Sequence, residues 1–322
     1  MSKSVAVLLA FCVSTVAAAG TTEHRSHAAP APSIVDVPPA GATLPMRDFG
    51  GRPVVEVRIN GKGPFDFILD TGATITVVDE KLAEELALSA EEGVRADSGG
   101  GPAPTIVTVK TLKVAGATIG GFLAAVMPLS NLLNTDGAPR GVLSALNFPG
   151  CLVGFDYPEK LITIKKGALA AADFRTIFDY PEDAALPSLP IRIAGQETRV
   201  HVDTGSATTL TLPRRFLSEL PLKSQPKEAG TARALGGSSP IFSAAVDGAL
   251  EIGSFKVELA EVSFSDMRLG GEIAPGNLGY GVLKDFAVTL DSKNRLVQLG
   301  PRSTPDERAP QLPTKGETGR TK

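Results

Sequence analysis

The sequence predicts an all-β protein made of two similar lobes, and three observations lead to this prediction. Short runs with alternating apolar residues are separated by turn residues, as in 54–59 before Asn60 and Gly61, a hairpin signal. Aromatic residues make up only 5% of the chain and Trp is absent, so the core must be aliphatic, which suits many short strands. Residues 67–73 reappear in similar form at 200–206, which indicates an internal duplication.

The first residues have the pattern of a signal peptide. Lys3 supplies the positive start, residues 5–16 are mostly apolar, and three alanines at 17–19 form a small-residue cleavage site. Such a segment is too short to span a bilayer permanently, so we expect an exported protein, periplasmic or secreted, without stable membrane insertion. Lipid attachment at Cys12 is the alternative, which the bulky Phe11 before it disfavours.

Composition divides the rest of the chain. The segment after the signal peptide is rich in Ala and Pro and predicts an extended linker or pro-segment, and the last residues are rich in Pro and charge, which predicts disorder. We therefore expect a signal peptide at 1–19, a linker or pro-segment at 20–44, an N-terminal lobe at 45–170, an inter-lobe linker at 171–185, a C-terminal lobe at 186–300 and a disordered tail at 301–322.

Each lobe repeats the same order of landmarks. After each repeated turn comes a second β run, at 75–78 and 209–212, and later an apolar segment containing Gly, at 141–146 and 276–281. Each lobe then has a hairpin with Asp near its tip, at 153–158 and 288–293. Only 80–88 and 213–220 have the pattern of short helices. Two lobes of one plan, related by a pseudo-twofold axis, would bring Asp70 and Asp203 face to face.

Two neighbouring carboxylates can hydrolyse a peptide bond without a metal or a covalent intermediate. Carboxylates about 3 Å apart cannot both ionise, so they share one proton, and one acts as base while the other acts as acid. Gly72 and Gly205 would let the backbone turn closely under each carboxylate, and the two Thr hydroxyls can hold the loops together. Duplication of the motif in matching context makes a chance origin improbable, whereas a single Asp-Thr-Gly would predict only a tight turn.

These residues resemble the aspartic protease family. The first motif, Asp-Thr-Gly-Ala at 70–73, is similar to the retroviral type, and the second, Asp-Thr-Gly-Ser at 203–206, is similar to the pepsin type. The resemblance implies a bilobed pepsin/retropepsin-like acid protease fold with pseudo-twofold duplicated lobes, and Asp70 and Asp203 as the catalytic residues. It implies that the active-site loops are supported by their other motif residues, namely Thr71, Gly72, Ala73, Thr204, Gly205 and Ser206.

Two features depart from the pepsin pattern. Ser144 stands in the first lobe where Gly279 stands in the second, within the segment that the family packs under each catalytic loop. None of the three tyrosines lies where the pepsin type has its flap Tyr. The candidate flaps are glycine-rich, because Gly permits both movement and close approach of the backbone to a ligand. They contain Gly99, Gly100 and Gly101 in the first lobe and Gly236 and Gly237 in the second.

Other functions are disfavoured by the net charge and by the small numbers of histidine and cysteine residues. The formal charge of −3 gives no field that would attract nucleic acid. Two of the three histidines precede residue 30, which leaves His201 for a zinc site or a catalytic triad, and we interpret it as a packing residue. Cys151 lies in an apolar run and is interpreted as a buried small hydrophobe. We therefore expect neither a metal nor another cofactor.

We predict an aspartic endopeptidase that acts as a monomer on a peptide or protein substrate. The alternatives are a non-catalytic peptide-binding protein with a protease-like fold, and a structural envelope protein of β-sandwich type. Ala73 lacks the hydroxyl that would stabilise the ionised pair, so we expect a mildly acidic to neutral pH optimum.

Overall fold

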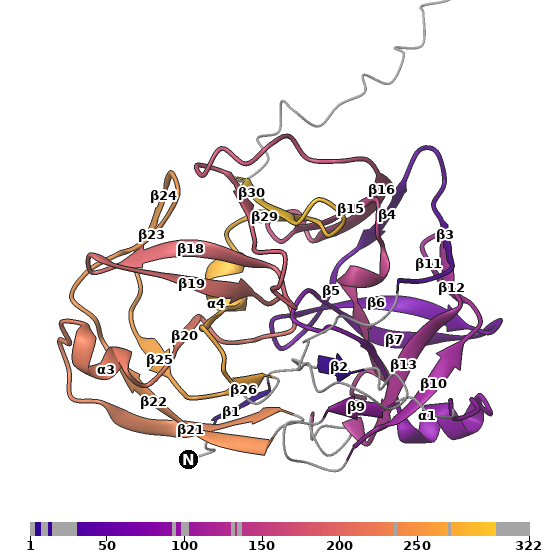
Figure 1. The fold of residues 1–322 in the computed structure, drawn as a ribbon, viewed down its shortest axis with the longest axis horizontal. Helices are drawn as coiled ribbons and strands as arrows, with labels where there is room; N and C mark the ends of the chain where they lie inside the picture. Colours follow the sequence, from indigo (N-terminus) through magenta and orange to yellow (C-terminus); the bar gives the residue numbers. More distant parts are fainter. Residues whose placement is uncertain are drawn as a thin grey trace, which may run out of the picture.

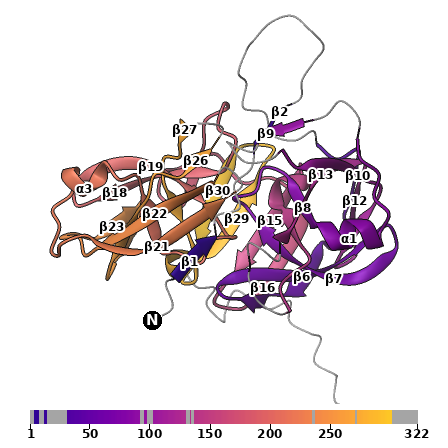
Figure 2. The same ribbon diagram turned by 90° about the horizontal axis from the view of Figure 1, so that it is seen from below.

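The structure is a computed structural model that describes residues 31–91, 103–129, 133, 137–234, 237–269 and 272–300, and the backbone of 4–7, 12–14 and 95–97. Figures 1 and 2 show two lobes side by side, the N-terminal one in indigo to magenta and the C-terminal one in salmon to orange. Almost all regular structure is β, arranged in one large sheet for each lobe and a third sheet between them. The all-β, two-lobed fold predicted from the sequence is confirmed.

The sheet of the N-terminal lobe is built around the long hairpin that leads to Asp70. Its strands are β3 (Ile34–Asp36), β5 (Arg47–Phe49), β6 (Arg52–Ile59), β7 (Lys62–Asp70), β8 (Thr76–Asp79), β10 (Thr105–Val109), β11 (Leu112–Val114), β12 (Ala117–Gly120), β13 (Phe122–Met127) and β14 (Gly141–Ser144). The order is β10-β13-β8-β14-β7-β6-β11-β12-β3, with β5 pairing with β6. Asn60 and Gly61 both have positive φ, the conformation that a two-residue hairpin turn requires.

The sheet of the C-terminal lobe repeats this plan around Asp203. Its strands are β1 (Ser4–Val7), β18 (Ser188–Ile193), β19 (Gln196–Val202), β20 (Leu210–Leu212), β21 (Lys227–Ala234), β22 (Gly237–Ala244), β23 (Leu250–Ile252), β24 (Phe255–Val257), β25 (Val262–Phe264) and β28 (Asn277–Leu278). Strand β14 runs parallel to β7 in the first lobe, and β28 runs parallel to β19 in the second. Asp70 and Asp203 therefore occupy equivalent positions, each at the end of the second strand of its hairpin.

The third sheet joins the lobes. It has the order β17-β30-β29-β15-β16-β4 and therefore pairs β15 of the first lobe with β29 of the second. Its strands are β4 (Ala42–Pro45), β15 (Cys151–Asp156), β16 (Leu161–Lys166), β17 (Ile177–Asp179), β29 (Ala287–Asp291) and β30 (Leu296–Gly300). Both hairpins that the repeat predicted, one from each lobe, are the centre of this sheet (Figure 1).

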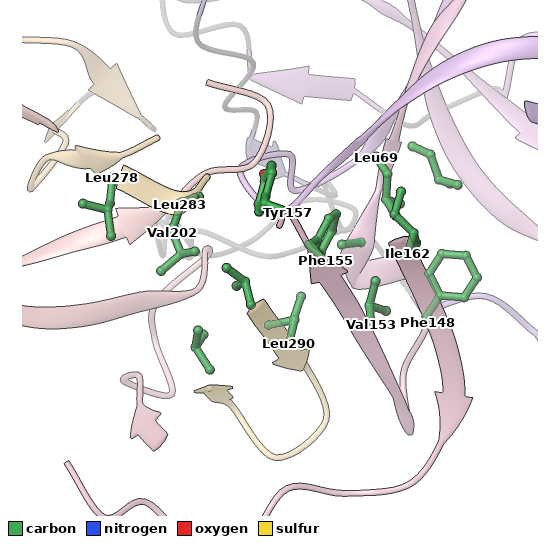
Figure 3. Close-up of a cluster of buried hydrophobic side chains, with 14 of the residues drawn as sticks. Leu69, Phe148, Val153, Phe155, Tyr157, Ile162, Val202, Leu278, Leu283 and Leu290 are labelled. Carbon is green, nitrogen blue, oxygen red and sulfur yellow. The ribbon is translucent and has the colours of Figure 1, made fainter. Parts of the chain in front are cut away.

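One continuous hydrophobic core runs through both lobes and this sheet. Figure 3 shows Leu69 and Phe148 from the first lobe, and Val202, Leu278 and Leu283 from the second, on either side of side chains of the central sheet. The central residues are Val153, Phe155 and Leu290. Because Leu69 and Val202 each precede an aspartate, this core fixes the positions of the loops that carry Asp70 and Asp203.

Two boundaries differ from those expected from composition. The expected linker at 20–44 contributes β3 and most of β4, and Val37 and Ala42 are buried in the core. The inter-lobe segment 171–185 contributes β17. In both places a few apolar residues among Pro and Ala are enough to form an edge strand of a sheet. The composition of the segment therefore does not predict its secondary structure.

The remaining elements are short. The helices are α1 (Glu80–Glu85), α3 (Phe216–Glu219), α4 (Tyr280–Leu283) and the 3-10 turn η1 (Ala145–Asn147), and two further strand pairs join β2 (Cys12–Ser14) to β9 (Arg95–Asp97) and β26 (Arg268–Leu269) to β27 (Glu272–Ile273). Helices α1 and α3 lie where the two short helices were expected. Strands β1 and β2 fall within the expected signal peptide, and the expected tail at 301–322 lies outside the described residues.

Candidate active site

Asp70 and Asp203 occupy equivalent positions in the two lobes. Asp70 is the last residue of β7, and Asp203 directly follows β19. The relative exposure of these residues is 0% and 1%. The structure therefore buries two acidic side chains at the junction of the lobes, a costly arrangement unless protons or hydrogen bonds compensate for it.

The two loops face each other so closely that each glycine lies against the aspartate of the other lobe. A methyl group placed on Gly72 would lie 2.5 Å from Cγ of Asp203, and one placed on Gly205 would lie 2.4 Å from Cγ of Asp70. Asp70 Oδ1 accepts hydrogen bonds from the backbone N–H of Gly72 at 2.7 Å and of Gly205 at 3.1 Å. Both glycines are thus required by space, and the constraint comes from the aspartate of the other lobe, whereas the sequence indicated only a close turn under the aspartate of the same lobe.

The motif threonines form a symmetric bridge between the lobes. Thr71 Oγ1 donates to the carbonyl of Val202 at 2.6 Å, and Thr204 Oγ1 donates to the carbonyl of Leu69 at 2.9 Å. Each hydroxyl also accepts the backbone N–H of the other threonine at 3.1 Å. These four hydrogen bonds are buried and tie the strand before each aspartate to the loop of the other lobe.

Each lobe has a serine hydroxyl beside its Asp-Thr-Gly loop. It belongs to Ser144 in the first lobe and to Ser206 in the second. Ser144 Oγ donates to the carbonyl of Ala73 at 2.6 Å, so a hydroxyl lies against the loop that contains Ala73. In the second lobe the hydroxyl belongs to Ser206, and a methyl group on Gly279 would lie 3.0 Å from it and 2.5 Å from a backbone oxygen. Ser144, which stands where the second lobe has Gly279, therefore supplies beside the first loop a hydroxyl that Ala73 lacks.

Burial raises the pKa values of both aspartates, and the charge of Asp203 raises that of Asp70 further. The pKa of Asp70 is raised well above its usual value, first by desolvation and then by the charge of Asp203. Desolvation raises the pKa of Asp203 to about 6, although its hydrogen bond with Asp70, the charge of Arg52 and the Gly205 N–H oppose the shift. The two groups titrate as a pair that holds one shared proton over a wide pH range.

Three polar side chains beside the pair escaped the sequence analysis. Arg52 is buried and donates from Nε to the carbonyl of Gly205 at 2.8 Å. The hydroxyl of Tyr157 is buried without a hydrogen-bond partner among the described residues, and the charges of Asp203 and Asp70 add to the burial that raises its pKa. Asn277 lies beside Asp203 and helps to lower its pKa. No local pattern marks these residues, because only the fold brings them to the aspartates.

The other residues singled out in the sequence have plain structural positions. His201 is buried in β19, where desolvation lowers its pKa to about 4, and Cys151 is buried and free, so both interpretations as core residues are confirmed. Of the candidate flap residues, Gly237 begins β22, while Gly99, Gly100, Gly101 and Gly236 lie outside the described residues.

No cluster of three or more possible metal ligands occurs in the part of the chain that the structure describes. Within the same part, no helix has the length and apolar character needed to cross a membrane.

A family model described as aspartyl protease matches the chain twice, at residues 55–148 and 189–282. Each match contains one Asp-Thr-Gly loop and the segment that packs beneath it. The two matches together cover more than half of the chain, and the protein therefore belongs to the aspartyl protease family. No curated protein matches the sequence.

The threonine bridge predicts a specific loss of stability. Thr204→Val keeps the shape of the side chain but removes the donor to Leu69 and the acceptor for Thr71, so we expect the free energy of unfolding to fall by about 2–4 kcal/mol. Thr204→Ser keeps the hydroxyl and should lose about 1 kcal/mol, the value of a buried methyl group. Urea unfolding would measure both, and equal losses for the two variants would contradict a role for the hydroxyl.

Proposed function

We propose that the protein is an aspartic endopeptidase in which Asp70 and Asp203 activate water for peptide hydrolysis. The observation that carries the proposal is the face-to-face position of the two buried loops, each with its glycine against the aspartate of the other lobe. Family membership supports the same reaction class.

The unpartnered oxygens identify where a proton would be shared. Among the described residues, Asp70 Oδ2 and Asp203 Oδ1 are buried without a hydrogen-bond donor, while the two carboxyl groups interact as a hydrogen-bonded pair. The ionised carboxylate would remove a proton from water as its oxygen attacks the scissile carbonyl carbon. The protonated partner would give its proton to the carbonyl oxygen, and proton transfer to the leaving nitrogen would then break the C–N bond.

A peptide substrate would bind in an extended conformation. Strands β9 and β21 lead toward the two glycine-rich segments, and each pairs at its edge with a short strand from the N-terminal segment, β2 or β1. Edges that accept one extended chain suit the recognition of another, in which main-chain hydrogen bonds supply affinity and pockets select side chains.

We also propose that the enzyme acts after export, in the periplasm or outside the cell. The positive start and apolar run of residues 1–19 support this proposal. N-terminal sequencing of the protein recovered from its source should find a start after Ala19. A mature chain that keeps Lys3 would contradict export by cleavage.

Loss of either carboxylate should abolish turnover without unfolding the protein. We expect Asp70→Asn and Asp203→Asn each to lower kcat/KM by about a thousandfold or more, because a single carboxyl cannot serve as both acid and base. Cleavage of a diverse peptide library, followed by mass spectrometry, would measure this in the protein that lacks residues 1–19.

Asp66→Asn is the matched control, since Asp66 lies on the same strand as Asp70 but forms a surface ion pair with Arg47. Its activity should equal that of the parent. A folded parent that binds peptides with no cleavage at any pH would instead indicate the non-catalytic peptide-binding function.

The raised pKa values predict activity near neutrality. The pair is active with one proton, so protonation of Asp203, with its pKa of about 6, should reduce kcat/KM as the pH falls through that value. Loss of the shared proton should reduce it only at higher pH, because the pKa of Asp70 is also raised. A pH–rate profile would test this, and a maximum below about pH 3 would contradict it.

A further inference from the structure

A tight turn of the N-terminal lobe reaches across the lobe boundary next to the active site. Gly50 and Gly51 connect β5 to β6 with positive φ at both positions. A methyl group on Gly51 would lie 2.7 Å from the ring of Tyr280, which begins α4 of the other lobe. The contact places the next residue, Arg52, beneath the loop that carries Asp203.

Arg52 contacts the backbone that holds the carboxylate pair. Its side chain reaches across the boundary, and Nε donates to the carbonyl of Gly205 at 2.8 Å. The N–H of the same glycine donates to Asp70 Oδ1 at 3.1 Å. The guanidinium group therefore fixes a residue that touches the pair directly.

The buried negative groups that face the positive charge of Arg52 are the carboxyl groups of the aspartate pair. Only 8% of the residue is exposed, and none of the ion pairs among the described residues includes it. The negative groups that act on it are Asp203, Asp70 and Asp48. Asp48 is exposed, and its carboxylate accepts the N–H of Gly51. A buried arginine needs a compensating charge, and the singly ionised aspartate pair supplies one.

The second lobe has no equivalent cation. Val54 pairs with Ile68, two residues before Asp70, and Ser188 pairs with His201, two residues before Asp203. Counting back two residues from Val54 and from Ser188 aligns Arg52 with Leu186, which lies just before β18 and is buried. One positive charge thus faces a pair that carries one negative charge.

We propose that Arg52 is a positioning residue that holds the Asp70–Asp203 pair in its singly ionised form and fixes Gly205 against it. The inference rests on the proposed protease function and extends it to the regulation of the pair's protonation.

No other group near the pair could supply this charge within the described residues. Tyr157 faces both aspartates but is neutral, because burial raises its pKa well above the usual value. His201 is uncharged above its pKa of about 4. Tyr280 and the amide of Asn277 carry no positive charge.

Removal of the charge should move the whole pH profile upward. Arg52→Gln keeps an N–H donor but not the cation, so both pKa values of the pair rise, and both limbs of the kcat/KM profile should shift by about one pH unit or more toward alkaline pH. Arg52→Lys keeps the charge and should restore most of the parent profile. Arg58→Gln, an equal change at an exposed position on the same strand, should leave the profile unchanged.

Stability supplies a second measurement that does not require activity. The folded pKa values of the pair are raised, so the stability that the pair contributes is present below about pH 4 and declines as the pH rises through the folded values. Arg52→Gln raises these values further. Its urea midpoint should therefore fall further below that of the parent at about pH 8 than at about pH 5.

The outcomes separate this inference from the proposed function. If Arg52→Gln is destabilised equally at both pH values, or keeps the parent pH profile, Arg52 has only a packing role and the inference is wrong. If the folded parent cleaves no peptide, the proposed function fails, and the pH dependence of unfolding alone decides on Arg52. An upward shift with rescue by Lys supports the inference.

Discussion

The structure depends on keeping two buried carboxyl groups close together in spite of their repulsion. Desolvation favours protonation of both Asp70 and Asp203, and the charge of Asp203 also favours protonation of Asp70, so both pKa values are raised. The loops would separate unless other contacts held them. The threonine bridge supplies four buried hydrogen bonds across the lobe boundary, and the shared core under Leu69 and Val202 prevents the strands from moving apart. These contacts thus hold the lobes together at the place where the two carboxyl groups would push them apart.

The pseudo-twofold relation between the lobes is kept in the backbone but not in every side chain. A serine hydroxyl lies beside each Asp-Thr-Gly loop, and it comes from Ser144 in one lobe and from Ser206 in the other. Ser144 donates to the carbonyl of Ala73, whereas the contacts around Gly279 exclude any side chain. The two lobes therefore place this serine at different positions of the same plan.

Features that repeat in the chain could be predicted from the sequence, and features that depend on distant packing could not. The duplicated motif predicted both aspartates, the glycines and the threonine bridge, because local turn geometry and symmetry determine them. Arg52 lies 153 positions from its partner Gly205, and nothing in its strand marks it. From the sequence, Tyr157 could be noted only as one of three tyrosines outside the flap position, yet it is buried close enough to both aspartates for their charges to raise its pKa. The strands β3 and β4 were missed because their flanking Pro and Ala residues dominate the composition.

The position of Arg52 shows what a fused pair of lobes permits. In a symmetric dimer of one lobe, every side chain near the axis occurs twice, so an arginine at this position would place two positive charges beside a pair that carries one negative charge. The fused chain has Arg52 in one lobe and Leu186 in the other, which matches one charge with one. The arginine also acts on Asp203 more strongly than on Asp70. The two aspartates therefore differ in their charged surroundings, and duplication within one chain allows a symmetric fold to hold two unequal carboxyl groups.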